Sequence, residues 1–255
     1  MRTADWTESV SVLDRVTAVF EAFGEHDEGL GVSELARRAN LPKSTVSRIA
    51  ADLVEQRFLD RDGDMLYLGV RLFELGQTVE QPRRLRRLAL PVMTDLRDTT
   101  GQTVHLAVLE GIDVVFIAIV RGGPVPTPLA RVGGRLPAHA TALGKAILAF
   151  SPQDVVERIT SGQLERRTVH TLVDPSAFAR ELAGIRRTGT ATELQECAMG
   201  RTCTASPILG QGGAPIGAIS VTGAIDEVVS DRIAPAVRAA ALALSHRIGA
   251  GSRTH

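Results

Sequence analysis

The chain of 255 residues is poor in several residue types: it has two cysteines, two lysines, one tryptophan and one tyrosine. Two cysteines are too few for a disulfide framework, and the C-x5-C spacing of Cys197 and Cys203 is not that of a zinc site. The sequence has no apolar run as long as a membrane span and no signal-peptide pattern at its N-terminus. We therefore expect a cytoplasmic protein with no membrane partner, no metal and no cofactor.

Aromatic residues make up 4% of the chain and apolar residues 44%, so the core must consist mainly of Ala, Val, Leu and Ile. The length allows one large or two ordinary domains. The net charge of zero is unevenly distributed: residues 1–80 carry 9 Arg and Lys against 15 Asp and Glu, and the remainder carries 20 against 14. An acidic N-terminal region argues against nucleic-acid binding there. Cations nevertheless gather around residues 37–61, at Arg37, Arg38, Lys43, Arg48, Arg57 and Arg61.

The segment Val32–Leu53 contains two runs with helical periodicity, separated by Asn40-Leu41-Pro42. Asn40 is typical of a helix end, and Pro42 suits the first turn of the next helix. The spacing predicts a helix-turn-helix with a recognition helix over Lys43–Gln56. Its outer side carries hydroxyls and cations that suit a DNA surface: Lys43, Ser44, Thr45, Ser47 and Arg48. A plain helical hairpin with a solvated polar face is the alternative.

The residues that follow favour DNA binding. Phe58–Gly69 predicts two short strands around an Asp-Gly turn, which form a wing that adds Arg61 to the DNA-binding set. A helix over Ser9–Phe23 precedes the motif, and Ser33 is the expected N-cap of its first helix. Beyond the wing we expect a helix over Val70–Val79, a break at Gln81-Pro82 and a helix to Thr100. The last helix carries Arg83, Arg84, Arg86 and Arg87, either as a solvated face or as phosphate contacts.

The second half of the chain predicts a mixed sheet flanked by helices, a compact α/β module that suggests a ligand sensor. Small residues dominate the start of a helix in Leu136–Ala149, where they allow close approach of a ligand or another backbone. Further helices are expected from Ser151-Pro152, between Asp174-Pro175 and Gly189, and over Ser230–Ile248. The expected strands are Thr103–Leu109, Val114–Val120, Leu129–Val132, Ala191–Glu196, Thr202–Leu209 and Ala214–Thr222.

Three ordered motifs resemble those of the IclR (isocitrate-lyase-regulator) family of bacterial transcription factors. They are LARRANLPKSTVSRI with its wing, GRLPAHATALGKA at residues 134–146, and CTASPI at 203–208 followed by GAISVTG at 217–223. The resemblance implies an α+β two-domain fold: a winged helix-turn-helix at 9–69, a linker helix at 70–82 and a GAF-like α/β effector-binding domain at 83–250. It also implies homodimers or dimers of dimers on palindromic operators in double-stranded DNA.

The resemblance also implies an effector pocket. Its apolar wall would include Ala142 and Leu143, with Val125 and Leu129 from the preceding loop, and backbone N–H groups near Thr141 would grip an anion. Polar contacts would come from Glu193, Cys203, Ser220 and Thr222. This set suits a small organic acid or an aromatic catabolite. A ligand carboxylate beside Glu193 would need a proton or a bridging donor, and Arg121, Arg131 or Arg135 could supply the countercharge.

The leading interpretation is an effector-responsive transcriptional regulator whose operator affinity changes when a small molecule binds. An enzyme with Cys203 as nucleophile and His139 or His105 as base is an alternative, although no nucleophile motif supports it. A metal site built from Cys197, Cys203 and a histidine is a weaker one. We expect His139 and Lys145 to serve the structure, with Lys145 paired to an acid.

Overall fold

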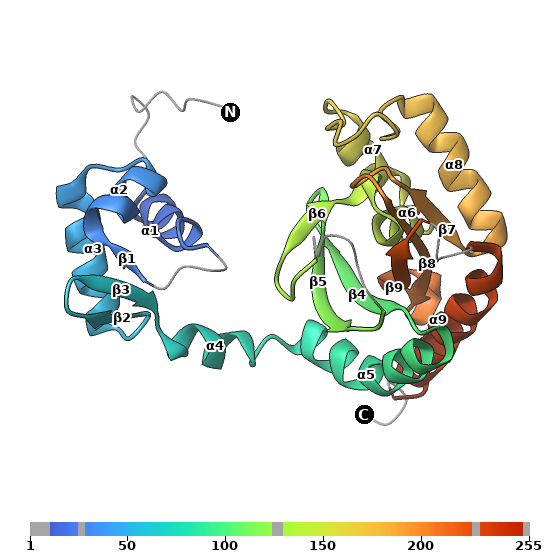
Figure 1. Ribbon diagram of the computed structural model, residues 1–255, viewed down its shortest axis with the longest axis horizontal. Coiled ribbons are helices and arrows are strands. Elements are labelled where there is room, and N and C mark those ends of the chain that lie inside the picture. The colour runs from blue at the N-terminus through green and yellow to red at the C-terminus, as the bar shows by residue number, and fades with distance from the viewer. Residues whose placement is uncertain (1–10, 25–28, 124–129, 226–229, 252–255) are drawn as a thin grey trace. The chain divides into compact units, whose positions relative to one another are not determined.

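The computed structural model describes residues 11–24, 29–123, 130–225 and 230–251. The chain divides into two compact units, residues 1–80 and 81–255, which are described separately here (Figure 1). No helix in the described ranges has the length and apolar character that crossing a membrane would require.

The N-terminal unit is a winged helix-turn-helix, as expected. Its helices are α1 (Val12–Glu21), α2 (Val32–Ala39), α3 (Lys43–Glu55) and α4 (Val70–Gly76). Its antiparallel sheet has the order β1-β3-β2, with β1 at Leu30–Gly31, β2 at Leu59–Asp62 and β3 at Met65–Leu68. The inner residues predicted for α2 and α3 are buried in one core, namely Leu35, Ala36, Ala39, Val46, Ile49, Ala50 and Leu53. This core fixes which side of α3 is exposed.

The turns of this unit follow from local chemistry, with two corrections. Asn40 ends α2 in the left-handed conformation with φ of 53°, and Pro42 is the residue just before α3. Ser33 is not the N-cap of α2, because the helix begins at Val32, two residues earlier than expected, and Gly31 is the N-cap without a side-chain hydrogen bond. Strand β1, which pairs with β3, is not among the strands predicted from the sequence. A two-residue strand is too short to show a periodicity.

The C-terminal unit contains a six-stranded sheet with the order β6-β5-β4-β9-β8-β7. All of its pairings are antiparallel, so the predicted mixed sheet is wrong. The prediction of a strand at 129–132 is also wrong for the described residues 130–132, which are not in a strand. Strand pairing with β5 begins at Arg135, after the Gly133-Gly134 turn. The strands are β4 (Thr103–Glu110), β5 (Asp113–Val120), β6 (Arg135–Pro137), β7 (Ala191–Leu194), β8 (Arg201–Leu209) and β9 (Pro215–Ala224).

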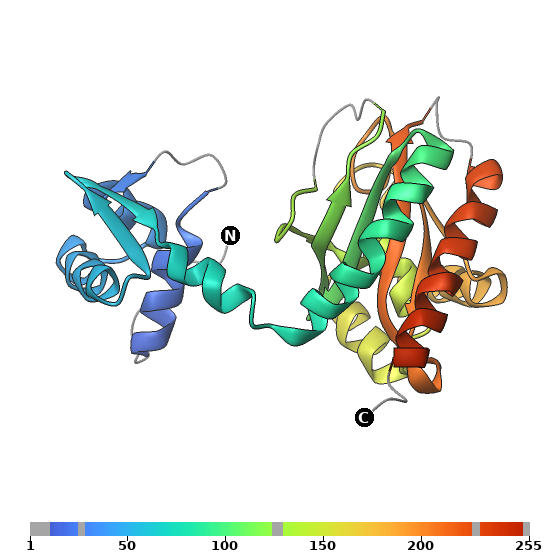
Figure 2. The same cartoon turned by 90° about the horizontal axis from the view of Figure 1, so that it is seen from below.

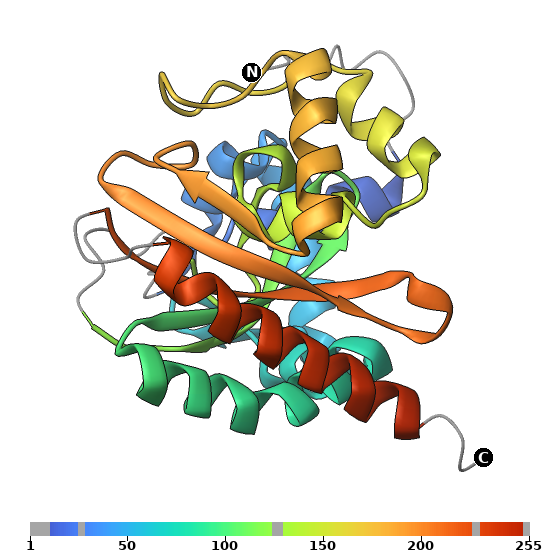
Figure 3. The ribbon, with the colours of Figure 1, turned by 90° about the vertical axis from the view of Figure 1, so that its right-hand side faces the viewer.

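Helices cover both faces of this sheet. On one face lie α5 (Glu80–Thr100) and α9 (Ser230–Gly251), side by side (Figure 2). On the other lie α6 (Ala142–Leu148), α7 (Gln153–Thr160) and α8 (Pro175–Thr188) (Figure 3). Helix α5 begins before Pro82, which therefore stands in its first turn, where its missing N–H is not needed. The break between the two helices was predicted at Gln81-Pro82, but it lies between the end of α4 at Gly76 and the start of α5 at Glu80.

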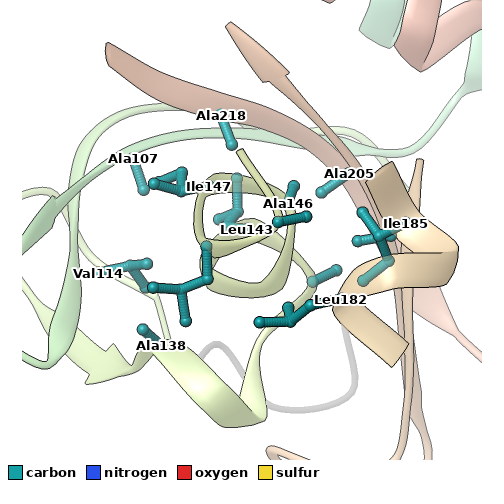
Figure 4. Close-up of a cluster of buried hydrophobic side chains, with 14 of the residues drawn as sticks. Ala107, Val114, Ala138, Leu143, Ala146, Ile147, Leu182, Ile185, Ala205 and Ala218 are labelled. Carbon is teal, nitrogen blue, oxygen red and sulfur yellow. The ribbon is translucent and has the colours of Figure 1, made fainter. Parts of the chain in front are cut away.

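Alanine is the commonest residue of the core between α6 and the sheet, and most of the others are Val, Leu and Ile, as expected from the composition. Leu143 and Ile147 of α6 point into a cluster with Ala107 and Ala218 of the sheet (Figure 4). Small residues on the strands let this short helix lie close to the sheet. Helix α8 closes the cluster with Leu182 and Ile185, among other residues. The predicted limits of α8 are correct, because Asp174 caps its start and Gly189 ends it with φ of 73°.

Candidate functional site

The predicted DNA-reading face is accessible on α3 and the wing. Lys43, Ser44, Ser47, Arg48 and Arg61 are exposed, and Thr45 is half-buried. Because the opposite side of α3 is held in the core, its five side chains of this set project away from the core, and Arg61 adds a cation on the wing. Their role in DNA binding stays a prediction.

Helix α2 contributes less positive charge to this surface than its sequence suggests. Glu34 accepts hydrogen bonds from the guanidinium groups of Arg37 and Arg38, at 2.6 to 2.8 Å. These bonds lower the pKa of Glu34 to about 2. The two arginines thus have an acid partner, and attraction to phosphates depends more on α3 and the wing. An open groove between α1, α2 and α3 is lined by Thr45 and also by Arg15 and Ser33. Arg15 and Ser33 are not among the DNA contacts predicted from the sequence.

A small pocket lies on the α6 side of the C-terminal sheet. It is lined by His105, Phe116, Ala130, Leu136, Thr141, Ala142, Leu143, Glu193, Cys197, Ala198, Arg201, Cys203 and Thr222. The structure therefore brings together most of the predicted effector-binding set. Ser220 is fully buried and is not among the lining residues, while Val125 and Leu129 lie outside the described residues. Ala130, which follows Leu129, does line the pocket.

The polar floor of the pocket follows the register of the sheet. Glu193 on β7 lies opposite Cys203 on β8, and Cys203 lies opposite Thr222 on β9. Side chains of directly paired residues share one face of a sheet, so these three form a row across it. His105 on β4 belongs to the next row, opposite Ser220. Strand pairing thus joins residues far apart in the sequence.

Glu193 is the titratable carboxyl group of this floor. Its Oε1 accepts hydrogen bonds from the backbone N–H groups of Glu196 and Cys197. Burial raises the pKa of Glu193 to about 7, although these two bonds and the charge of Lys145 act in the opposite direction. A carboxyl group in this range exchanges its proton near neutral pH, so it can both accept and donate a hydrogen bond to a ligand.

The thiols of the pocket are held protonated. Burial, followed by the charge of Glu193, raises the pKa of Cys203 to about 12 and that of Cys197 to about 11. Burial and the charges of Arg201 and Arg121 lower the pKa of His105 to about 3, so its imidazole is neutral. A protonated thiol is a poor nucleophile, which opposes the enzyme alternative. Among the described residues, no group of three or more His, Cys, Asp or Glu is arranged to hold a metal ion.

Arg201 is the cation among the lining residues of the pocket, and it is not among the residues predicted from the sequence. Its side chain is buried, and Nη2 donates to Oγ1 of Thr222 at 3.4 Å. The suggested alternatives Arg121, Arg131 and Arg135 are exposed and do not line the pocket. Since Arg201 precedes Cys203 by two residues, both must point to the same face of one strand. A strand prediction extended by one residue at its start would have found it.

Two polar side chains beside the pocket, those of Lys145 and His139, serve the structure, as expected from the sequence. Nζ of Lys145 is fully buried and contacts the carboxylates of Glu181 at 2.6 Å and Glu196 at 2.5 Å. His139 shares a hydrogen bond with the carbonyl oxygen of Glu165 at 2.9 Å through Nε2. Neither residue lines the pocket.

The start of α6, which forms one wall, requires glycine at position 144. Oγ1 of Thr141 accepts a hydrogen bond from the N–H of Gly144 at 3.1 Å, and a Cβ on Gly144 would lie 2.1 Å from the carbonyl oxygen of Ala138. We expect Gly144→Ala to lower the free energy of unfolding by about 2 kcal/mol, because backbone must move to make room. Urea denaturation followed by circular dichroism measures this.

Gly184→Ala is the matched control, since Gly184 lies inside α8 and its added Cβ would meet only the end of the Arg187 side chain, at 3.9 Å. We expect this change to stabilise the protein by about 0.5–1 kcal/mol through helix propensity. Equal effects of the two substitutions would contradict the steric argument.

Comparison with known proteins places both units in one family. The family model described as "IclR helix-turn-helix domain" matches residues 12–63, and the model described as "Bacterial transcriptional regulator IclR C-terminal" matches residues 77–246. The transcriptional repressor IclR of Escherichia coli is 32% identical over 91% of this chain and 86% of its own length. The glycerol operon regulatory protein of Streptomyces coelicolor is 29% identical over 95% of this chain and 98% of its own.

Solved structures show the same likeness. An IclR homologue from Microbacterium hydrocarbonoxydans, crystallised with 4-hydroxybenzoate, has a TM-score of 0.85 and 33% identity over 93% of this chain and 99% of its own. The IclR protein of Thermotoga maritima has a TM-score of 0.75 and 28% identity over 93% of this chain and 98% of its own. These relatives are regulators and not enzymes, and the Cys203 enzyme hypothesis is therefore abandoned. The chain belongs to the IclR family of bacterial transcriptional regulators.

Proposed function

We propose that this regulator binds its operator through α3 and the wing, and that a small aromatic or carboxylic acid in the C-terminal pocket changes that binding. The observation that carries the proposal is the pocket itself, in which a buried cation, a carboxyl group and neutral donors stand among apolar walls. Such a mixture fits a small, polar-ended organic molecule. The similar protein from Microbacterium hydrocarbonoxydans, which was crystallised with 4-hydroxybenzoate, supports an aromatic acid.

The same proposal covers the assembly on DNA. We infer a homodimer or a dimer of dimers on a palindromic operator, with residues 9–69 reading DNA, 70–82 linking and 83–250 binding the effector. Symmetric half-sites require a second copy of the recognition helix. Repression is the expected output, since the relative from Escherichia coli is named a repressor. A protein that acts on bacterial operators works in the cytoplasm.

Arg48→Ala tests the DNA-reading surface. Arg48 is exposed on α3 and can form a bidentate contact with guanine. We expect the substitution to weaken binding to the DNA upstream of the protein's own gene by about 1–3 kcal/mol. Electrophoretic mobility shifts at several salt concentrations, with and without competitor DNA, measure the change.

Arg180→Ala removes an exposed arginine from α8 in the other unit and is the matched control. It should leave operator binding unchanged. If both variants bind as the wild type does, α3 does not read the operator.

A second experiment tests whether an effector controls operator binding. 4-Hydroxybenzoate and other organic acids are added to the wild-type complex with DNA, and we expect at least one acid to change the affinity for the operator.

A further inference from the structure

We propose that Arg201 selects ligands with a carboxylate, and that the ligand lies across β8 with its carboxylate toward Arg201 and a distal hydroxyl toward Glu193. This inference rests on the proposed effector function and specifies the chemistry of that site. It identifies the ligand class as aromatic acids with a hydroxyl group at the far end of the ring.

The position of Arg201 makes it the charge-recognising group. Its side chain lines the pocket while only 8% of the residue is exposed, so the guanidinium acts in a weakly solvated environment. Charge-assisted hydrogen bonds are strongest in such surroundings, and a planar guanidinium matches the two oxygens of a carboxylate. His105 lies in the same pocket as a neutral imidazole and can add a donor beside this group.

Thr222 positions the guanidinium. Oγ1 of Thr222 donates to the carbonyl oxygen of Thr202 at 3.1 Å, so its single proton is already used within the protein. The same oxygen accepts the long contact from Nη2 of Arg201. Thr222 therefore has no proton left for a ligand carboxylate, and the sequence-based expectation of a direct polar contact from Thr222 becomes an indirect one through Arg201.

Glu193 stands at the opposite end of the row. It pairs with Cys203, which in turn pairs with Thr222, so the backbone positions of Glu193 and Thr222 are separated by two strand spacings, roughly 10 Å. Arg201 belongs to the same strand as Cys203, but its guanidinium contacts Oγ1 of Thr222 and therefore lies on the side of Cys203 away from Glu193. A benzene ring with substituents at opposite ends spans such a gap, whereas a two- or three-carbon acid reaches only one of the two groups.

The walls between these ends suit a flat ring. Phe116, Leu136 and Leu143 supply apolar surface, and Ala142 and Ala198 leave room beside it. The thiol of Cys203 is polarisable and favourable beside an aromatic ring. The orientation follows from charge: a ligand carboxylate beside Glu193 would face an acidic group, but beside Arg201 it gains a countercharge.

Four probes separate the two ends of the ligand in isothermal titration calorimetry. 4-Hydroxybenzoate carries both groups, 4-hydroxybenzamide lacks the negative charge, benzoate lacks the hydroxyl, and pyruvate is a short acid. We expect the wild type to bind 4-hydroxybenzoate about tenfold to a hundredfold more tightly than the amide, the usual effect of losing a charged hydrogen bond. Pyruvate should bind more weakly than 4-hydroxybenzoate.

Three variants assign the preferences to residues. Arg201→Gln should reduce the acid-over-amide preference to about twofold or less while binding of the amide changes little. Arg201→Lys keeps the charge and should retain part of the preference, which separates recognition from a folding defect. Glu193→Gln should instead reduce the preference for 4-hydroxybenzoate over benzoate. Arg135→Gln, which removes an exposed arginine that contacts Asp113, is the control and should change neither ratio.

The outcomes separate this inference from the function on which it rests. An unchanged acid-over-amide preference in Arg201→Gln, or a lost one in Arg135→Gln, overturns the role of Arg201. Binding of pyruvate but none of the aromatic probes to the wild type overturns the inference and leaves the pocket as an effector site. If no acid binds and none alters the operator complex, both the inference and the proposed function are wrong.

Discussion

Replacing Lys145 with methionine should lower the free energy of unfolding by about 3–5 kcal/mol at neutral pH, the usual cost of removing one partner from a buried ion pair. Lys145 is fully buried on α6, and its ammonium group contacts Glu181 and Glu196. Methionine fills similar space without the charge, which leaves the carboxylate of Glu196, whose side chain is 10% exposed, without its cation. Glu181, which is 32% exposed, can regain water and should contribute less to the loss. Urea denaturation followed by circular dichroism gives the value.

The chain supplies its own control, since its other lysine, Lys43, is exposed on α3. Lys43→Met should change stability by no more than about 0.5 kcal/mol. Adding Glu196→Gln to Lys145→Met removes the stranded charge as well, and we expect the double variant to recover part of the loss. A double variant less stable than the wild type by the sum of the two single losses would show that the two side chains do not interact.

The ion pair also links α6 to the pocket. Glu196, which binds Lys145, lies in the turn between β7 and β8, and its N–H donates to Glu193. The hydroxyl of Thr171 donates to the carbonyl oxygen of Glu196 from a third segment. The turn that carries the floor residue Glu193 is thus held from both sides. This explains how an irregular segment can present a carboxyl group at a defined place.

Local signals predicted most of the fold. Asn40 and Pro42 mark the turn before α3, and Asp174 and Gly189 mark the ends of α8. The predicted Asp-Gly turn of the wing lies at Gly63-Asp64, directly after Asp62. Each of these features depends on backbone preferences of one or two residues. Strand direction depends instead on pairing between segments far apart in the chain. The mixed sheet predicted from the sequence is wrong because β4 pairs antiparallel with β9, a strand from the far end of the chain that local signals do not place.

The candidate site, like the fold, was predicted only where its residues are close together in the chain or belong to the motifs of the resemblance. Thr141, Ala142 and Leu143 follow each other in the chain and were found together, along with Glu193, Cys203 and Thr222 from the family resemblance. His105 and Phe116 enter the pocket only because β4 and β5 pair beside β9, which no sequence spacing reveals. Arg201 was hidden by a strand limit set one residue too late.

Glu193→Gln should make stability depend on pH differently from the wild type. The pKa of Glu193 is about 7 in the folded protein, against an ordinary value of 4.5, so between these values the folded state keeps a proton that the unfolded chain has released. The unfolded state is therefore increasingly favoured as pH rises through this window. At about 1.4 kcal/mol for each pKa unit, the wild type should lose about 3 kcal/mol by pH 8 relative to pH 4.5 from this group alone.

The glutamine variant carries no such group, so its stability relative to the wild type should rise by about 3 kcal/mol between pH 4.5 and pH 8. Urea denaturation of both proteins at several pH values measures this difference, from which the other titrating groups cancel. Glu110→Gln, at the exposed end of β4, removes the same charge outside the pocket and is the control for the loss of a surface carboxylate. A difference between Glu193→Gln and the wild type that does not change with pH would mean that the carboxyl group of Glu193 ionises in the folded protein as it does in the unfolded chain. Burial on the pocket floor would then not hold its proton, and a ligand hydroxyl would always meet a carboxylate there.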